Sequence, residues 1–346
     1  MNTQYHDAMR RAFELAERGP RTGENPQVGC VLVDSTGAIV SEGWHRGAGT
    51  PHAEVDALSK IESAAGLTAV VSLEPCNHTG RTGPCAEALI AAGIERVIYA
   101  STDPGNASAG GAETLRNAGI ETYSNLLVDH ADELIRPWAT ATRLGRPHVT
   151  LKWASSLDGR TAAADGTSKW ISCAESREDS HRRRAEQDAI IAGTGTIIAD
   201  DSELTARYSD GTLYAHQPLR VVLGERELPA DARVFNAAAE TIQLATHDIK
   251  AALHELFDRG VRRVWVEGGP TVASEFARLD LVDEIIVYLA PLLIGGPKSA
   301  LTEIGVAAIT DAKRFQLVEH RRMNEDIMVR AIRRPEKHEP QEESKA

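Results

Sequence analysis

The first half of the chain alternates short apolar runs with stretches of helical periodicity. The apolar run Val28–Val33, a polar turn at Asp34–Gly37 and a second run at Ala38–Trp44 together predict a β-hairpin. Because strands and helices then follow one another in turn, we expect a sheet flanked by helices. The further predicted elements are helices over Met1–Arg18, Glu54–Lys60, Cys85–Ala92 and Glu113–Ala118, and strands over Ala69–Leu73 and Arg96–Ala100.

The pattern changes around Pro137–Pro147, where a stretch with glycine, proline and arginine separates two halves. An alternating run, His148–Ala154, opens the second half. The sequence therefore predicts one domain over residues 1–146 and a second over residues 147–334. The tail, residues 335–346, is charged and contains proline, so we predict that it is disordered. The further elements predicted in the second half are strands over Ala189–Ala192, Leu219–Leu223, Arg263–Val266 and Glu284–Leu289, and a helix over Val272–Leu279.

Length and composition indicate a soluble protein of two globular domains. The 346 residues exceed one ordinary core, and 42% are hydrophobic and 25% charged. The formal net charge of -12 repels phosphate backbones and anionic lipid, so we expect neither nucleic acid nor membrane as a partner. We also expect no membrane span and no signal peptide. The four cysteines are too few for a disulfide framework, which favours a cytoplasmic location: Cys30, Cys76, Cys85 and Cys173.

Three short segments of the first half carry residue types that bind zinc: Pro51-His52-Ala53-Glu54, Glu74-Pro75-Cys76 and Pro84-Cys85. One imidazole and two thiolates leave a tetrahedral zinc ion with an open fourth position, where water can bind and lose a proton near neutral pH. Each ligand follows a proline, so we expect each one near the start of a helix, which stabilises negative charge. The predicted metal ligands are His52, Cys76 and Cys85.

Glu54 is the predicted general base and acid. It lies two residues beyond His52, so on the first turn of a helix the two side chains cannot point the same way. A carboxylate in that place can take a proton from water and pass it to a departing amine. His-x-Glu followed by two cysteine segments is the pattern of the zinc nucleobase deaminases. A purely structural zinc site would use four protein ligands, and no fourth is spaced nearby.

The spacing of the two cysteines narrows the class of deaminase. The segment from Asn77 to Pro84 separates them, whereas the usual spacing is two residues. With this insert, and with Asn25–Cys30 and Gly49–Glu54, the sequence resembles the bifunctional enzymes of riboflavin biosynthesis, in which a pyrimidine deaminase is fused to a reductase. The resemblance runs in segments from the first helix to Ile332. It implies a homo-oligomer whose chain is α/β throughout, with a cytidine-deaminase-like three-layer zinc domain followed by a dihydrofolate-reductase-like domain.

The resemblance implies a substrate for the first domain, 2,5-diamino-6-ribosylamino-4(3H)-pyrimidinone 5′-phosphate, which loses its 2-amino group by hydrolysis. The chemistry of the matched residues agrees, since a carboxamide pairs with an amide-like ring edge and a guanidinium beside an imidazole suits a phosphate. Two loops depart from the family, at Gly105-Asn106 and at Gly83, where the family commonly has Asn-Pro and a proline. The residues that would contact the ring or its phosphate are Asn25, His45, His78 and Arg81.

The second half resembles the family's reductase domain, which uses NADPH to reduce the ribosyl chain to 5-amino-6-(5-phosphoribitylamino)uracil. The matching segments are Lys152–Thr161, Ser168–Ser172, Ile198–Arg207 and Glu267–Thr271. Glycines before a helix let backbone N–H groups approach a phosphate, although no turn here has the full Rossmann pattern. The resemblance places Ala154, Trp170, Thr196, Asp200, Gly269, Pro270 and Thr271 on the nucleotide. It places Lys152, Ser168, Arg184, Leu204, Arg207 and Glu267 on the substrate.

Several alternatives stay open at the level of sequence. A nucleic-acid deaminase shares His52-Ala53-Glu54, but it predicts Cys-x-x-Cys and a basic face, against the long insert and the net charge of -12. A non-catalytic zinc module joined to a nucleotide sensor would have no use for Glu54. Activity of the first half alone also fits, because the reductase residues are less diagnostic. Within the reductase, Lys152 and Asp200 are both candidates to polarise the reacting carbon or to supply a proton.

Overall fold

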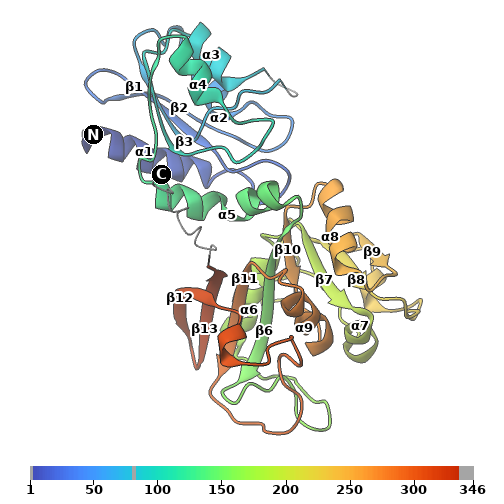
Figure 1. Cartoon of the computed structure of the whole chain (residues 1–346). Helices are drawn as coiled ribbons and strands as arrows, with labels where there is room; N and C mark the ends of the chain where they lie inside the picture. Colours follow the sequence, from blue (N-terminus) through green and yellow to red (C-terminus); the bar gives the residue numbers. More distant parts are fainter. Residues whose placement is uncertain (1–2, 80–82, 335–346) are drawn as a thin grey trace, which may run out of the picture. The chain divides into compact units, whose positions relative to one another are not determined.

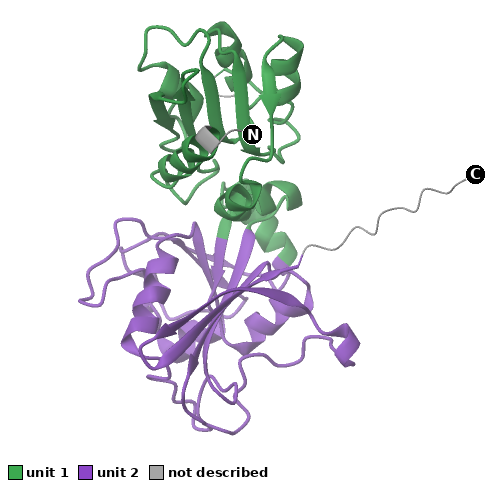
Figure 2. Ribbon diagram, turned by 90° about the vertical axis from the view of Figure 1, so that its left-hand side faces the viewer, with its two compact units in different colours: residues 1–147, 250–263 green, residues 148–249, 264–346 purple. Residues whose placement is uncertain are grey.

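The computed structural model describes residues 3–79 and 83–334, and the chain forms two compact units (Figure 1, Figure 2). Unit 1 comprises Met1–Pro147 with Lys250–Arg263, and unit 2 comprises His148–Ile249 with Val264–Ala346. Among the helices of the described residues, none has the length and apolar character needed to cross a membrane. The predicted disordered tail, residues 335–346, lies outside the described residues.

The sheet of unit 1 is mixed. Over the described residues it has five strands in the order β2-β1-β3-β4-β5. β1 runs antiparallel to β2 and β3, whereas β3, β4 and β5 are parallel. The predicted hairpin is confirmed, because Gly29 pairs with Trp44 across β1 and β2. The strands are β1 (Gly29–Val33), β2 (Ile39–Trp44), β3 (Thr68–Leu73), β4 (Arg96–Ser101) and β5 (Glu121–Tyr123).

Helices cover both faces of this sheet, which gives unit 1 three layers (Figure 1). Successive strand residues point to opposite faces. Cys30 and Leu32 pack against α2, α3 and α4, whereas Val31 and Val33 pack against α1 and α5. The predicted sheet flanked by helices is confirmed. The helices are α1 (Thr3–Ala16), α2 (Ala53–Leu58), α3 (Cys85–Ala91), α4 (Gly111–Asn117) and α5 (Val128–Leu144).

Helix α5 passes through the region where the sequence pattern suggests a junction. Pro137 lies inside the helix, although an internal proline costs about 3 kcal/mol. Burial of the next turn offsets this cost, since Ile135, Trp138 and Ala139 pack against Leu73. The helix ends only at Gly145, which has a φ of 61°. The connection to unit 2 is therefore shorter than the polar pattern indicates.

A segment from the second half of the sequence belongs to unit 1. It contains α8 (Ile249–Asp258) and the residues up to Arg263. The His254 Nδ1–H group donates a hydrogen bond to the Gly145 carbonyl at 3.1 Å. At the end of the segment Gly260 lies against the Glu24 side chain, so a Cβ there would stand 2.8 Å from Glu24 Oε1. The sequence pattern carries no sign of this packing.

Unit 2 is built on a larger mixed sheet, eight-stranded within the described part of the chain, in the order β12-β13-β11-β6-β10-β7-β8-β9. β10, β7, β8 and β9 are parallel to one another, and β6 is parallel to β11. β13 pairs antiparallel with β11 and β12. The strands are β6 (His148–Ser156), β7 (Ala189–Gly193), β8 (Leu219–Leu223), β9 (Thr241–Leu244), β10 (Arg263–Val266), β11 (Glu284–Ala290), β12 (Phe315–Met323) and β13 (Asp326–Arg333).

The core of unit 2 lies where Trp265, Tyr288 and Met328 meet on one face of this sheet. Helix α6 is fastened there by Asp179, which accepts hydrogen bonds from Tyr288 Oη at 2.7 Å and Arg183 Nε at 2.8 Å. The helices of unit 2 are α6 (Ala174–Arg184), α7 (Thr194–Asp200) and α9 (Pro270–Arg278), with short 3-10 turns at Arg233–Phe235 and Ile309–Asp311.

Candidate active sites

Three predicted metal ligands converge in unit 1. His52 precedes α2, Cys85 begins α3, and Cys76 lies in the loop after β3. Their ligand atoms all lie within 4.8 Å of one another. His52 Nδ1 is 3.2 Å from Cys85 Sγ and 3.4 Å from Cys76 Sγ. These separations suit a tetrahedral zinc ion with a Zn–N bond of about 2.0 Å and Zn–S bonds of about 2.3 Å. The residues present therefore fit a zinc ion with one open position.

The expectation that every ligand begins a helix is wrong for Cys76. Its segment is extended and is held by backbone hydrogen bonds, from Asn77 N to Ser108 O at 2.8 Å and from Ala86 N to Cys76 O at 3.2 Å. The start of α3 serves both thiols instead, because Cys85 N lies 3.5 Å from Cys76 Sγ. The neighbouring Cys85 thiol and the His52 ring hold the pKa of Cys76 well below its usual range, as a thiolate ligand requires.

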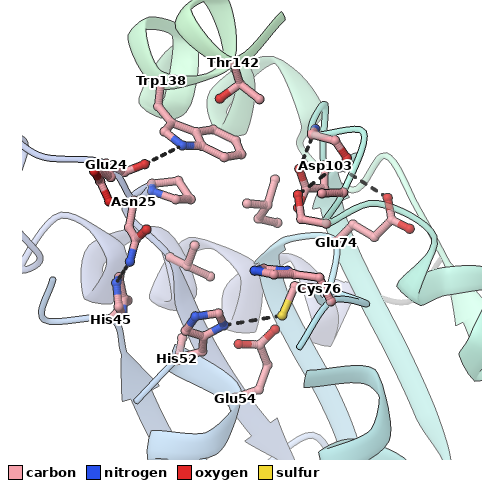
Figure 3. Close-up of a pocket in the computed structure, with 18 of the residues that line it drawn as sticks. Glu24, Asn25, His45, His52, Glu54, Glu74, Cys76, Asp103, Trp138 and Thr142 are labelled. Carbon is pink, nitrogen blue, oxygen red and sulfur yellow. Dashed lines mark hydrogen bonds between the residues drawn. The ribbon is translucent and has the colours of Figure 1, made fainter. Parts of the chain in front are cut away.

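Glu54 lies in the first turn of α2, on the metal-ligand side of a cavity (Figure 3). Its side chain is buried. Burial first, and the negative charge of Cys76 second, raise the pKa of the Glu54 carboxyl to about 7. A bound cation would oppose this shift by stabilising the carboxylate. A carboxyl that titrates near neutrality can both accept and return a proton, which is the predicted role.

The cavity over these residues has a volume of about 360 Å³, within the range of small-molecule sites. Predicted substrate residues Asn25, His45 and His78 line it, whereas Arg81 lies outside the described residues. The full lining is Glu24, Asn25, Pro26, Val28, His45, His52, Ala53, Glu54, Leu73, Glu74, Cys76, His78, Asp103, Gly105, Asn106, Ala107, Ser108, Trp138 and Thr142.

His45 and Asn25 fix each other's orientation. His45 Nδ1 lies 3.1 Å from the Pro51 carbonyl, which can only accept, so Nδ1 carries the proton. His45 Nε2 therefore accepts from Asn25 Nδ2 at 2.9 Å, and burial lowers the pKa of the ring, which favours this neutral form. The Asn25 oxygen is left as an acceptor for a ligand. His78 Nδ1 is buried without a hydrogen-bond partner among the described residues, so it is a second polar atom suited to a ligand.

Several cavity residues escape the sequence motifs. Glu74 accepts hydrogen bonds from Asp103 N at 3.2 Å and Ala112 N at 3.0 Å, so it holds the loop that carries Gly105 and Asn106. Its place in Glu74-Pro75-Cys76 is a signal that could have drawn attention to it. Trp138 and Thr142 come from α5, in the stretch that resembles a junction, and no motif marks them.

In unit 2, three predicted substrate residues form one partly buried network around a carboxylate. Glu267 Oε1 accepts from Lys152 Nζ at 2.7 Å, and Oε2 accepts from Arg184 Nε at 2.8 Å. Trp265 Nε1 also donates to Oε2, at 2.9 Å. Although burial opposes ionisation, the charges of Arg184 and Lys152 hold the pKa of Glu267 well below its usual range. The carboxylate therefore stays charged and keeps both cations in place.

Thr205 links this network to the other predicted substrate residues. Its carbonyl accepts from Arg184 Nη1 at 2.9 Å, and its hydroxyl accepts from Arg207 Nη1 at 3.1 Å. Leu204 is buried next to it, with a φ of 52°. His181, which the sequence motifs miss, lies with Nδ1 3.1 Å from the Thr205 carbonyl. Burial, with the charge of Arg184, lowers the pKa of His181 to about 3, so the ring is neutral.

The predicted nucleotide residues are only partly brought together. Thr196 Oγ1 accepts a hydrogen bond from Gly269 N at 3.0 Å, which joins α7 to the turn that begins α9 at Pro270 and Thr271. A Cβ on Gly268 would stand 3.0 Å from the Val272 side chain, so a larger residue there would have to displace Val272. Ala154 follows Lys152 on β6 and packs against the core. Ser168, Trp170 and Asp200 are exposed, and the Arg177 guanidinium lies 4.4 Å from the Trp170 ring centre.

Two family models match the chain. The cytidine and deoxycytidylate deaminase zinc-binding region matches residues 2–101, and the RibD C-terminal domain matches residues 147–329, which is more than half of the chain. The chain belongs to the RibD family. The α/β fold predicted from the sequence, a cytidine-deaminase-like domain followed by a reductase domain, is thereby confirmed. The family's members are enzymes of riboflavin biosynthesis with a zinc-dependent deaminase and an NADPH-dependent reductase, and so is this chain.

Similar proteins cover almost the whole chain. The riboflavin biosynthesis protein RibD of Mycobacterium tuberculosis is 46% identical over 315 residues, which cover 90% of this chain and 92% of that protein. Form 1 of Acinetobacter baumannii RibD is 38% identical, with a TM-score of 0.87 over 96% of this chain and 99% of that one. A Thermotoga maritima diaminohydroxyphosphoribosylaminopyrimidine deaminase/5-amino-6-(5-phosphoribosylamino)uracil reductase is 32% identical, with a TM-score of 0.85 over 96% and 99%.

Proposed function

We propose that this enzyme deaminates 2,5-diamino-6-ribosylamino-4(3H)-pyrimidinone 5′-phosphate in unit 1. The product is then reduced with NADPH in unit 2 to 5-amino-6-(5-phosphoribitylamino)uracil. The observation that carries the proposal is the convergence of His52, Cys76 and Cys85 beside Glu54 in a cavity of about 360 Å³. The name of the Thermotoga maritima relative describes the same pair of reactions.

In the deaminase, His52, Cys76 and Cys85 would hold zinc, which when bound activates water for attack on a ring carbon. Glu54 accepts the proton of that water on its carboxylate and returns a proton to the leaving nitrogen, so that ammonia departs. The Asn25 oxygen accepts from an N–H group of the ring, and His45 keeps the carboxamide turned for this contact.

The phosphate of the substrate is assigned to His78 with Arg81. The unpartnered His78 Nδ1 atom supports this role, because a buried polar atom without a protein partner favours a ligand. Arg81 lies outside the described residues, and its assignment depends on the family motif and on the affinity of guanidinium for phosphate. Replacing either side chain is expected to raise KM for the phosphorylated substrate more than it lowers kcat.

In the reductase, NADPH supplies a hydride to the ribosyl carbon, and we assign Lys152 to supply the proton that the ring oxygen takes up as the sugar opens. Lys152 lies in the partly buried Glu267 network, whereas the other candidate, Asp200, is exposed at the end of α7. Arg184 donates hydrogen bonds to Glu267 and to the Thr205 carbonyl, so it links these two parts of the site. Arg207 Nη1 contacts Thr205 Oγ1 and Glu203. We assign its guanidinium to the substrate phosphate, with Ser168 and Leu204 beside it.

The nucleotide is assigned to the Gly269–Thr271 turn with Ala154, Trp170, Thr196 and Asp200. Two features of the turn support this assignment. Gly268 and Gly269 have no side chains, and a Cβ on Gly268 would crowd Val272. Helix α9 begins at the turn, so its first backbone N–H groups are suited to a phosphate. We expect NADPH to be preferred over NADH, on the strength of the family match. Direct titration of the enzyme with each nucleotide should show a lower Kd for NADPH, and equal Kd values would contradict the preference.

The experiment that tests the whole proposal supplies purified protein with the phosphorylated diaminopyrimidinone and identifies the products by mass. Without NADPH the substrate should lose its amine and ammonia should appear. With NADPH the ribityl compound should follow. Unchanged substrate in both reactions, from protein that contains zinc, would contradict the assignment.

We also propose that the enzyme is a cytoplasmic homo-oligomer that acts on this small molecule without nucleic acid or membrane as a partner. The free cysteines support a reducing compartment, since zinc-binding thiolates are lost on oxidation. Exposed apolar side chains of β12 and β13, Leu317, Val318 and Ile327, support contact with another copy. Sedimentation at several concentrations tests the oligomer, and a monomer throughout would contradict it.

A further inference from the structure

Trp138 is the largest cavity residue that the zinc-deaminase motifs do not account for. It lies on α5, well beyond residues 2–101, the span that matches the deaminase zinc-binding region. Its side chain is 9% exposed and packs with Leu73 and Ile135, with Val28 against the same cluster. Leu73 directly precedes Glu74-Pro75-Cys76, so the indole ring is seated close to the metal-ligand loop as well as in the cavity wall.

The single hydrogen-bond donor of Trp138 binds an acceptor of the protein itself. Its Nε1–H group donates to the Glu24 carbonyl at 3.0 Å (Figure 3). An indole has no other donor and no acceptor, so this contact fixes the backbone of Glu24 rather than a ligand. Glu24 belongs to a segment without helix or strand, where a backbone carbonyl has no ladder of its own to hold it.

Glu24 is followed by Asn25, and from there hydrogen bonds continue to the metal ligand. Asn25 Nδ2 donates to His45 Nε2 at 2.9 Å, and His45 Nδ1 donates to the Pro51 carbonyl at 3.1 Å. Pro51 precedes His52. The Asn25 segment is thus held at the Asn25 side chain by His45 and at the backbone of the preceding residue, Glu24, by Trp138.

We propose that Trp138 is a positioning residue of the deaminase, which acts through Asn25 by holding the Glu24 carbonyl. The inference rests on the proposed role of Asn25 in binding the ring. It implies that α5, a helix outside the zinc-binding region, contributes to substrate recognition. Loss of the indole donor alone should weaken the contact to the ring while leaving the metal site and the reductase intact.

The test compares Trp138→Phe and Trp138→Leu with Asn25→Ala in the full-length, zinc-loaded enzyme. Both Trp138 variants keep an apolar side chain and lose the donor. KM for the diaminopyrimidinone phosphate should rise about 3- to 10-fold, the range of one hydrogen bond, with a smaller change in kcat. Zinc content and reduction of the deaminated pyrimidine serve as controls. A merely structural defect would lower kcat and both controls without moving KM.

A double-variant cycle decides whether Trp138 acts through Asn25. In the Asn25→Ala background, Trp138→Phe should have little further effect on KM, because the group it positions is gone. Independent effects that multiply would overturn the proposal, as would an unchanged KM in both Trp138 variants. If Asn25→Ala itself leaves KM unchanged, the proposed function of Asn25 fails instead, so the two failures are distinguishable.

A measurement on the unaltered enzyme covers the case in which neither Trp138 variant folds. With ¹⁵N-labelled indole groups, the Trp138 Nε1–H signal should be protected from solvent exchange. Saturation with the deaminated pyrimidine phosphate should slow this exchange further, because binding at Asn25 stabilises the same segment. Exchange that is unaffected by the ligand would overturn the proposal.

Discussion

Glu54 and Glu267 are both enclosed carboxyl groups, and their surroundings shift their pKa values in opposite directions. Burial raises the pKa of Glu54 to about 7. For Glu267 the same effect of burial is outweighed by Arg184 and Lys152, which lower its pKa. The first carboxyl is thereby suited to exchange a proton, whereas the second is suited to hold charge and orient a lysine.

Replacing Glu54 with glutamine keeps the size of the side chain and removes its ability to accept a proton. Loss of general acid–base help typically costs about 10²- to 10⁴-fold, so ammonia release should nearly stop. Zinc should remain bound, because Glu54 is outside the cluster His52, Cys76 and Cys85. Reduction should continue when the deaminated pyrimidine is supplied with NADPH. Ammonia release at the wild-type rate would refute the assignment.

Replacing Cys76 with alanine should remove the zinc. The described residues bring only His52 and Cys85 to the same point, and two protein ligands hold zinc far less tightly than three. Metal analysis should give one zinc per chain in the wild type and a large loss in the variant. Cys173→Ala is the matched control, since Cys173 lies in unit 2 and is outside this cluster, and it should keep its zinc. Full zinc in Cys76→Ala would sink the ligand assignment.

At the scale of elements, Asp179 is one of the carboxylates that fasten α6 to the sheet of unit 2. Asp179 accepts from Arg183 on its own helix, from Tyr288 on β11 and from Arg321 on β12. Burial opposes its ionisation, but the hydrogen bonds of Arg183 and Arg182 hold the pKa of Asp179 well below its usual range. Helix α6 carries Arg184 at its end, so this anchor also places the reductase network.

The lowered pKa of Asp179 makes part of the stability of unit 2 dependent on pH. A carboxyl whose pKa is depressed on folding stabilises the protein above its unfolded value of about 3.9, and this contribution is lost as the pH falls below that value. Asp179→Asn should lower the unfolding free energy at neutral pH by about 1–3 kcal/mol, because Arg183, Arg182 and Arg321 lose a charged hydrogen-bond acceptor. Denaturant titration at pH 7 and at about pH 3 should show that the difference in unfolding free energy between the wild type and Asp179→Asn is smaller in acid. An equal difference at both pH values would contradict this account.

The elements that the sequence pattern predicts are the buried ones. β3 and β7 are buried along their whole length, and short apolar runs mark them clearly. Strands β12 and β13 were not predicted. β12 lies at the edge of its sheet, and its charged residues such as Arg321 and Arg322 hide the alternation. Helix α5 was not predicted because Pro137 reads as a break, whereas tertiary packing around Trp138 keeps the helix intact.

The residues of the candidate sites also differ in how far the sequence predicts them. His52, Cys76, Cys85 and Glu54 could be predicted because their chemistry depends on residue type and short spacing. Trp138 could not, because its contact is to a backbone carbonyl more than a hundred residues away and leaves no motif. The Glu267 network was predicted in part. The resemblance to the family named Lys152, Arg184 and Glu267, and only the fold shows that they bind one another.

At the scale of the whole molecule, the two proposed reactions use residues of different units. The zinc cluster and its cavity belong to unit 1, and the Glu267 network belongs to unit 2. Each group is complete within its own unit among the described residues. The bifunctional chain is therefore expected to behave as two catalysts that can be disabled one at a time.

A mixture of two single variants tests this independence. Glu54→Gln should lack ammonia release, and Glu267→Gln should lack reduction because Lys152 and Arg184 lose their partner. Neither variant alone should form the ribityl product from the diaminopyrimidinone. Equal amounts of both, with NADPH, should form it after a lag while the deaminated compound accumulates in solution. Absence of product from a mixture whose separate activities are intact would mean that the intermediate passes only within one molecule.

The packing of residues 250–263 into unit 1 has a consequence for how the chain is made. The ribosome completes Pro147 well before it reaches Arg263, and at roughly 5–20 residues per second the interval is on the order of ten seconds. Throughout that interval the Gly145 carbonyl lacks its donor His254, and the Glu24 side chain lacks its close neighbour Gly260. Although its catalytic residues all come early, the deaminase unit cannot complete this packing until β6 to β9, four of the eight described strands of unit 2, have been synthesised. The folding of the two units therefore overlaps in time.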